Sequence, residues 1–127
     1  MIIKTPISLG ELVDKISILI IKKKNIKDNI KLDLINKELD LLNNTINKVV
    51  KEEIIRDYLN QLIDINSTLW QIEDDIRDCE RKKNFNENFV QLARSVYITN
   101  DKRAEIKLKI NKQFGSKIVE VKSYNKY

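Results

Sequence analysis

Charged side chains that stand among apolar neighbours are the residues of this sequence best suited to chemistry. At about 100° per residue, a helix places Arg94 beside Val90 at i−4 and Tyr97 at i+3. A polar group in such surroundings costs free energy unless it is paired. The sequence therefore predicts that Arg94 meets either a carboxylate of the protein or an anionic ligand.

A polar row with heptad spacing offers that carboxylate. Asn66, Glu73 and Glu80 recur every seven residues beside an apolar seam. Glu73 also precedes Arg77 by four residues, which is the favourable order for a helical ion pair. We predict a cluster of Glu73, Arg77 and Arg94. Two interpretations stay open: a structural network of ion pairs, or a pocket that binds phosphate or carboxylate.

The pocket interpretation adds residues around this cluster. Lys102 or Arg103 would supply further positive charge, and amides at Asn100 and Asp101 would present a helix N-terminus to an anion. The carboxylate of Asp101 argues against an anion there, because it already occupies the helix start. Other carboxylates would position a polar ligand or take part in acid-base chemistry. The candidate ligand-binding residues are Glu11, Asp14, Lys15, Glu73, Arg77, Arg94, Tyr97, Asn100, Lys102 and Arg103.

Missing residue types exclude several kinds of site. The 127 residues include no histidine and a single cysteine, Cys79. Histidine metal ligands, Ser-His or Cys-His nucleophiles and an intrachain disulfide are therefore excluded. The sequence also has no glycine-rich phosphate loop and no metal-binding motif. We expect no metal, no cofactor and a buried, inert thiol, and the sequence does not distinguish an enzyme from a binding protein.

The composition predicts one all-α domain over residues 1–127. Only 2 glycines and 1 proline occur, and 34% of the residues are charged. No apolar run approaches the length of a membrane span and no signal peptide is recognisable, so we expect a cytoplasmic protein. The net charge of +5 arises after residue 100, where eight basic residues face three acidic ones. That segment lacks an arginine-rich run and a pattern of stacking aromatics, which favours solvated surface over nucleic-acid binding.

The first helix is the best defined. Ser8 is a natural N-cap and Glu11 completes a capping box, so the helix is expected from Leu9 to about Lys24. Apolar residues cover most of its circumference. Such a helix is either central in a bundle or shared with a second subunit.

Two heptad seams follow, over residues 29–50 and 52–83. Almost no turn signal separates them, so they predict a long antiparallel hairpin with its reversal near Val50. The alternative is one continuous helix that pairs with another molecule. The apolar seam residues are Leu32, Ile35, Leu39, Leu42, Ile46 and Val49, then Ile55, Tyr58, Leu62, Ile65, Leu69, Ile72, Ile76 and Cys79.

Two shorter helices and a strap complete the predicted helical bundle. Asn84 or Asn86 is expected to cap a fourth helix, and a β-branched run weakens that helix near its end. Thr99 or Asn100 is expected to cap a fifth, which Gly115 ends as a C′ residue. We interpret the segment after Gly115 as an ordered strap or short strand over the bundle, with disorder as the alternative.

Four stretches, "PISLGELVDKISIL", "LWQIEDDIRDCERKKNF", "FVQLARSVYITNDKRAEIK" and "GSKIVEVKSY", together resemble a family of short, uncharacterised proteins of bacteria and phages, known only as a domain of unknown function. Some bacterial members are encoded near glycosyltransferase genes for surface polysaccharides. The likeness runs from Pro6 to Tyr127, is weakest over residues 23–60, and implies no activity. The residues in family-like stretches are Glu11, Asp14, Lys15, Glu73, Asp74, Arg77, Arg94, Tyr97, Asn100, Asp101, Arg103 and Lys122.

A fainter resemblance links the opening helix to the helical chorismate mutases. Lysines at residues 22–24 stand where that class needs a positioned arginine, and its other motifs are missing.

Three functions remain. The leading hypothesis is a small binding or adaptor protein, a homo-oligomer and preferably a dimer, whose charged cluster recognises an acidic or phosphorylated partner. The competing hypothesis is an enzyme for a small anionic metabolite, such as a nucleotide-sugar or sugar phosphate. The third is nucleic-acid binding by the basic C-terminal segment.

Overall fold

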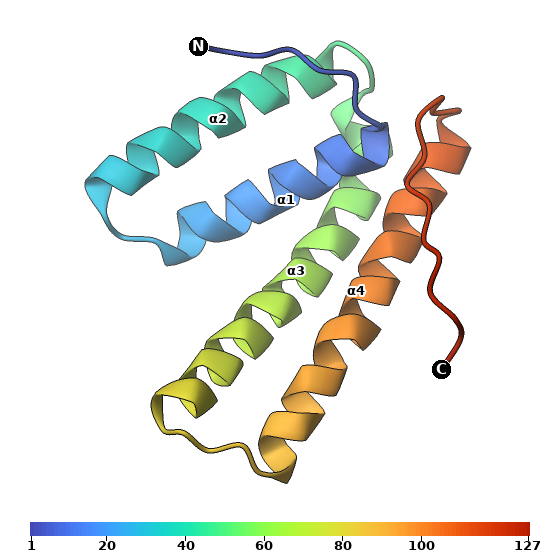
Figure 1. Ribbon diagram of the computed structural model, residues 1–127. Coiled ribbons are helices and arrows are strands. Elements are labelled where there is room, and N and C mark those ends of the chain that lie inside the picture. Colours follow the sequence, from blue (N-terminus) through green and yellow to red (C-terminus); the bar gives the residue numbers. More distant parts are fainter.

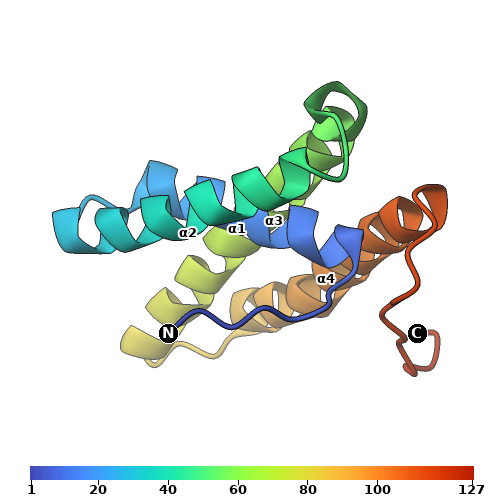
Figure 2. The same ribbon diagram turned by 90° about the horizontal axis from the view of Figure 1, so that it is seen from above.

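The computed structural model describes residues 1–127 and contains four α-helices and no strand, which confirms the all-α prediction. The helices are α1 (Leu9–Asn25), α2 (Asn29–Asn47), α3 (Glu52–Arg81) and α4 (Glu87–Gln113). They form two antiparallel pairs, α1 with α2 and α3 with α4 (Figure 1). Seen from above, the first pair crosses the second at an angle (Figure 2).

Side-chain caps begin three of the helices. The hydroxyl of Ser8 accepts the amide of Glu11 at 3.1 Å, as the capping-box prediction requires. Asp28 caps α2. Asn86, one of the two predicted residues, caps α4 by accepting the amide of Phe89 at 3.3 Å. These three starts follow from local chemistry alone.

Left-handed residues end α3 and α4. Gly115 has φ 64°, and the amide beyond it, on Ser116, donates to the carbonyl of Asn111 at 2.8 Å. This is the Schellman arrangement, and it confirms Gly115 as C′. Lys83 with φ 52° follows the end of α3, which stops at Arg81, two residues earlier than expected. Helix α2 ends at Asn47 and not at residue 50.

Helix α4 runs without interruption through the region where the sequence predicted a break. The prediction of two shorter C-terminal helices, with a cap at Thr99 or Asn100, is therefore wrong. Thr99 is buried, and the helix packs along α3 on this side. A β-branched residue costs only a few tenths of a kcal/mol in a helix, which tertiary packing easily outweighs.

The predicted hairpin of the second and third helices is also wrong. Helices α2 and α3 diverge from their junction at residues 48–51 and do not pack along each other (Figure 1). Helix α1 instead packs against α2, α3 and α4, so it lies at the centre of the bundle, one of the two alternatives that its apolar circumference left open. The apolar seam of α2 is therefore buried on α1.

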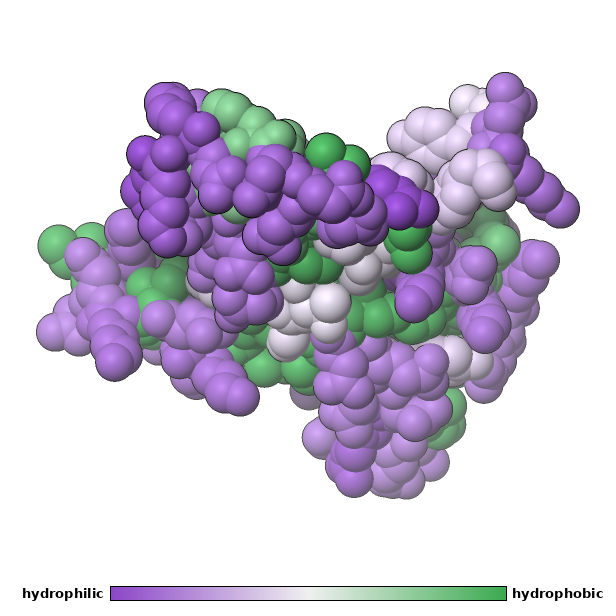
Figure 3. All heavy atoms as spheres, turned by 90° about the horizontal axis from the view of Figure 1, so that it is seen from below, coloured by the Kyte–Doolittle hydropathy of each residue, from purple (hydrophilic) through white to green (hydrophobic).

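The hydrophobic core lies where α1 meets the other helices. Leu62 of α3 and Ile110 of α4 are completely buried there. The tip of the α3–α4 pair projects beyond α1, so its residues are covered from one side only (Figure 1). From below, hydrophilic residues cover the projecting parts, while apolar residues show in the hollows between them (Figure 3). The buried apolar cluster comprises Leu12, Val13, Ile16, Leu19, Ile35, Leu39, Ile46, Ile55, Leu62, Ile106 and Ile110.

Residues 116–127, called the tail below, have no regular secondary structure. The tail turns back at Gly115 and runs beside α4 (Figures 1 and 2). None of the four helices has a stretch both long and apolar enough to cross a bilayer.

Candidate functional site

Arg94 does not form the predicted cluster. Its side chain is exposed and donates to the amide oxygen of Gln91 at 3.0 Å, within the same helix. Glu73 pairs with Arg77 at 2.6 Å on the surface of α3 and has no contact with Arg94. The prediction that Arg94 is buried against Glu73 is wrong. The remaining pair contributes little, because exposed i,i+4 pairs are typically worth less than about 1 kcal/mol.

The position of α1 explains why the cluster does not form. Asn66, Glu73 and Glu80 share one face of α3, as their spacing predicts. Helix α1 covers that face at Asn66, which is buried, but not at Glu80 farther along α3, which is exposed. Helical periodicity gives the face of a residue, whereas the crossing point of a neighbouring helix determines whether that face is covered.

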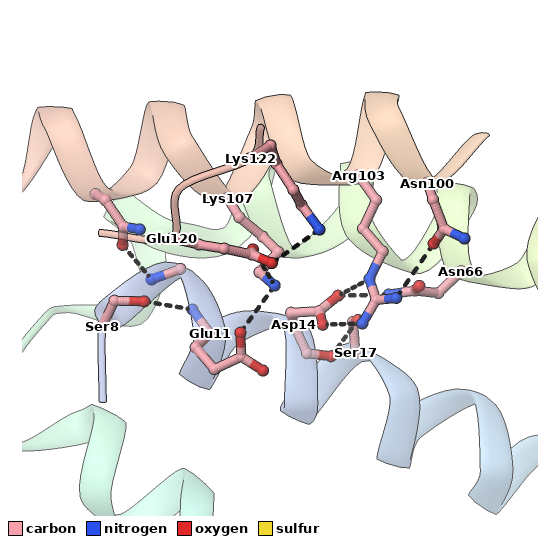
Figure 4. Close-up of polar contacts among 12 residues, drawn as sticks. Ser8, Glu11, Asp14, Ser17, Asn66, Asn100, Arg103, Lys107, Glu120 and Lys122 are labelled. Carbon is pink, nitrogen blue, oxygen red and sulfur yellow. Dashed lines mark hydrogen bonds and ion pairs between the residues drawn. The ribbon is translucent and has the colours of Figure 1, made fainter. Parts of the chain in front are cut away.

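A buried ion pair joins α1 to α4 instead. Asp14 is completely buried and accepts two hydrogen bonds from Arg103, one of them from Nε at 2.9 Å (Figure 4). The amide of Asn66 on α3 donates to Asp14 at 2.9 Å and to the hydroxyl of Ser17 at 2.8 Å. The bond to Asp14 raises the pKa of Arg103, although burial acts in the opposite direction. Three helices are therefore fixed to one carboxylate.

Lys107 lies one turn farther along α4 and has two carboxylate partners. Its side chain, only 9% exposed, is 2.8 Å from Glu11 of α1 and 3.0 Å from Glu120 of the tail (Figure 4). Lys122 of the tail reaches the same Glu120 at 3.0 Å. Burial lowers the pKa of Lys107, but the bonds to Glu11 and Glu120 outweigh it, so the pKa is raised. Hydrogen bonds from Lys122 and Lys107 lower the pKa of Glu120.

Asn111 completes a row of polar residues at four-residue spacing on α4, after Arg103 and Lys107. Its side-chain oxygen accepts the amide of Gly10 at 2.7 Å. The helices approach so closely there that a Cβ on Gly10 would lie 2.5 Å from the carbonyl oxygen of Lys107. The start of α1 is therefore fixed against α4 by this row.

A pocket of about 580 Å³ opens beside the row, between α4, the first turn of α1 and the tail. The hydroxyl of Tyr127 donates to the carboxylate of Asp101 at 2.7 Å, and its ring packs edge-on against Tyr97 at a centroid distance of 5.2 Å. Hydrogen bonding to Asp101 raises the pKa of Tyr127. The polar lining includes Glu11, Asn100, Arg103, Lys107, Glu120 and Lys122.

From residue 3 to residue 127 the sequence matches a family of unknown function, DUF6165. The chain belongs to this family. The match confirms the resemblance to an uncharacterised family over almost the whole chain. No curated protein and no solved structure matches the chain. In this member of DUF6165, the pocket is the feature that bears on function.

Some of the candidate residues come together at the pocket and others do not. Asp14 does not line the pocket, but it accepts hydrogen bonds from Arg103, which does. Those in the lining are Glu11, Tyr97, Asn100 and Arg103. Those outside it are Lys15, Glu73, Arg77, Arg94 and Lys102.

Sequence reasoning missed other pocket residues. Lys107 carries a recognisable signal, because it follows Arg103 by four residues beside the buried Ile106 and Ile110. The tail residues carry none. A segment without periodicity does not reveal which surface it will contact.

Charge is balanced in the pocket. Three cations line it, and three carboxylates face them. Arg103, Lys107 and Lys122 each already have a carboxylate partner. An anionic ligand would therefore form its strongest contacts with these cations by replacing one of the carboxylates. No group of three or more carboxylate or cysteine side chains suitable for a metal ion is present.

Proposed function

We propose that this protein is a small helical binding protein of the cytoplasm whose pocket recognises an acidic or phosphorylated group of a partner. The observation that supports this function is the position of Glu120. Its carboxylate bridges Lys107 and Lys122, which is the arrangement that a ligand carboxylate or phosphate would adopt (Figure 4).

The acidic group of a ligand would replace Glu120 and not the other carboxylates. Asp14 is buried within the helices, and Glu11 belongs to the first turn of α1, whereas Glu120 is on a segment without regular structure. Arg103 also has a donor to spare, because its Nη1 makes only a long contact of 3.4 Å to Asn100. A phosphate, with three acceptor oxygens, would accept hydrogen bonds from Lys107 and from this Nη1 group of Arg103.

Thermal stabilisation by anions tests the proposal. Inorganic phosphate, a phosphoserine peptide and an acidic peptide are added to the wild type, to Lys107→Ala and to Arg94→Ala, a matched control outside the pocket. We expect equal stabilisation of the wild type and of Arg94→Ala, and a loss of most of the shift in Lys107→Ala. No shift in any protein, or equal shifts in all three, would contradict the proposal.

An enzyme for a small anionic metabolite is the alternative, because the pocket has the volume typical of small-molecule sites. Glu11 beside Lys107 would then be the candidate acid or base. Nucleotide-sugars and sugar phosphates are tested as ligands in the same thermal-stabilisation experiment. Conversion of any of them by the wild type, lost in Glu11→Gln, would favour this alternative.

A homodimer is a further proposal, and its surface is not the one that the sequence indicated. The apolar faces of α1 and the seams of α2 and α3 are used within the chain. The outer face of α2 exposes Ile30, Leu34 and Leu41. In an antiparallel pair of α2 helices, Leu34 would meet Leu41, and Lys37 would lie near Glu38 of the second copy. Light scattering of Leu34→Lys against the wild type tests this dimer.

A further inference from the structure

The tail is itself a peptide seated in the proposed site, and its side chains bond to α4 at two places. Near its middle, Glu120 pairs with Lys107. At its last residue, Tyr127 bonds to Asp101 and packs against Tyr97. On α4, the cation of Lys107 therefore binds an acidic side chain of the tail. The ring of Tyr97 and the acceptor of Asp101 bind a tyrosine that lies seven residues later in the tail.

The geometry of α4 accommodates this spacing. Lys107 and Tyr97 are ten residues apart on one helix, which corresponds to roughly 15 Å. A segment of seven residues spans up to roughly 24 Å when fully extended. The interval from Glu120 to Tyr127 therefore covers the distance without strain, and a peptide from elsewhere with similar spacing would do so too.

The tail is held loosely. Every residue from 117 to 127 is exposed, and Val121 reaches 86%. A second pocket, of about 530 Å³, lies along the tail and is lined in part by Leu108 and Lys126. At the turn, a Cβ on Gly115 would have nothing within 4 Å. The tail can leave α4 without breaking any part of the core.

We propose that the surface of α4 from Lys107 to Tyr97 is a peptide groove, and that the tail occupies it until a partner protein replaces the tail with its own linear segment. That segment carries an acidic side chain for Lys107 and, about seven residues later, a tyrosine for Tyr97 and Asp101. The inference rests on the proposed function, because it identifies the acidic partner as a linear peptide.

Competition between the tail and a peptide tests the groove. A labelled synthetic peptide with the sequence SKIVEVKSYNKY, identical to residues 116–127, is titrated by fluorescence anisotropy. The proteins are the full-length wild type, Glu120→Gln, and Glu38→Gln as a control with the same change of charge on α2. Because the Gln tail competes less well, we expect Glu120→Gln to bind the peptide at least tenfold more tightly than the other two. A peptide with Gln in place of its Glu is expected to bind none of them.

A second measurement follows the tail directly. The through-space NMR contact between the rings of Tyr97 and Tyr127 is expected in the wild type and weaker in Glu120→Gln. If phosphate stabilises the wild type but the peptide binds Glu120→Gln no better, the groove is overturned and the proposed function stands. If neither phosphate nor any acidic peptide binds, both are overturned.

Light scattering separates a partner protein from a second copy of this chain. We expect the mass of the wild type to be unaffected by Glu120→Gln. A dimer that this substitution dissociates would assign the groove to the tail of a second copy, and would overturn the assignment to a partner protein.

Discussion

Two arginines of α4, Arg94 and Arg103, differ in what their side chains contact. Arg94 has the more apolar neighbours in the helix, whereas Arg103 lies beside Asn100 and Lys107, and both arginines were candidates. Arg103 faces the buried carboxylate of Asp14, whereas Arg94 has only Gln91 as a polar partner. The sequence therefore predicted an arginine with an acidic partner on another helix, but assigned this role to Arg94, and Arg103, which has such a partner, is only partly buried.

Asp14→Ala is expected to destabilise the fold strongly. The substitution removes the acceptor that holds Arg103 and Asn66, so that partly buried donors lose their partner. Breaking such a pair costs about 3–5 kcal/mol, measurable as a loss of unfolding free energy in urea. Glu73→Ala, in an exposed pair, is the control and is expected to cost less than about 1 kcal/mol. Equal losses of unfolding free energy in the two variants would show that the ion pair of Asp14 with Arg103 does not stabilise the fold.

The interaction between Asp14 and Arg103 can also be measured as a coupling free energy. In a double-mutant cycle of Asp14→Ala with Arg103→Met, the double variant should lose less than the sum of the single losses. The difference is expected to exceed about 1 kcal/mol, as for residues in direct contact. Additive losses would contradict direct pairing.

Helix ends and helix contacts depend on different parts of the sequence. The caps of α1 and α4 act within one turn, so local residue types predicted them. The contact of α1 with α4 depends on Gly10, whose small size is informative only once the partner backbone is known. Its amide bonds to Asn111, more than one hundred positions later in the chain.

Gly10→Ala is expected to lower stability although alanine favours a helix. The added Cβ would lie 2.5 Å from a backbone oxygen of Lys107, which cannot move aside as a flexible side chain would. Overpacking of this kind typically costs about 1–3 kcal/mol and exceeds the gain of about 1 kcal/mol in helix propensity. Urea denaturation gives the difference. A neutral or more stable Gly10→Ala would mean that α1 and α4 do not approach so closely.

Two crossed helical pairs with a loosely held tail make the attachment of the tail sensitive to pH. The buried apolar cluster contains no titratable group. The tail, by contrast, is attached through Glu120, Lys107 and Tyr127, all of which have shifted pKa values. Attachment of the tail should therefore depend on pH.

The tail is expected to stay attached only within a window of pH. The pKa of Glu120 is lowered, so its contribution is present above the ordinary glutamate value of about 4.3 and is lost as the pH falls further. The pKa values of Lys107 and Tyr127 are raised, so their contributions are present below ordinary values of about 10 and are lost as the pH rises further. The NMR contact between Tyr97 and Tyr127 measures attachment. A contact that persists unchanged after Glu120 has been protonated at low pH would contradict the role of Glu120.

Local interactions were enough to predict the helical class, the start of α1 and the turn at Gly115. They left two candidate caps for α4, and they left a central place of α1 as one of two alternatives. These properties depend on groups within a few residues of one another, or on the apolar circumference of one helix. The pairing of helices was not predictable in this way, because one heptad seam packs against another with similar energy whichever helix carries it. The ion pair of Asp14 with Arg103 joins residues 89 positions apart. Such a contact exists only after α1, α3 and α4 have crossed, and the pocket beside it exists for the same reason.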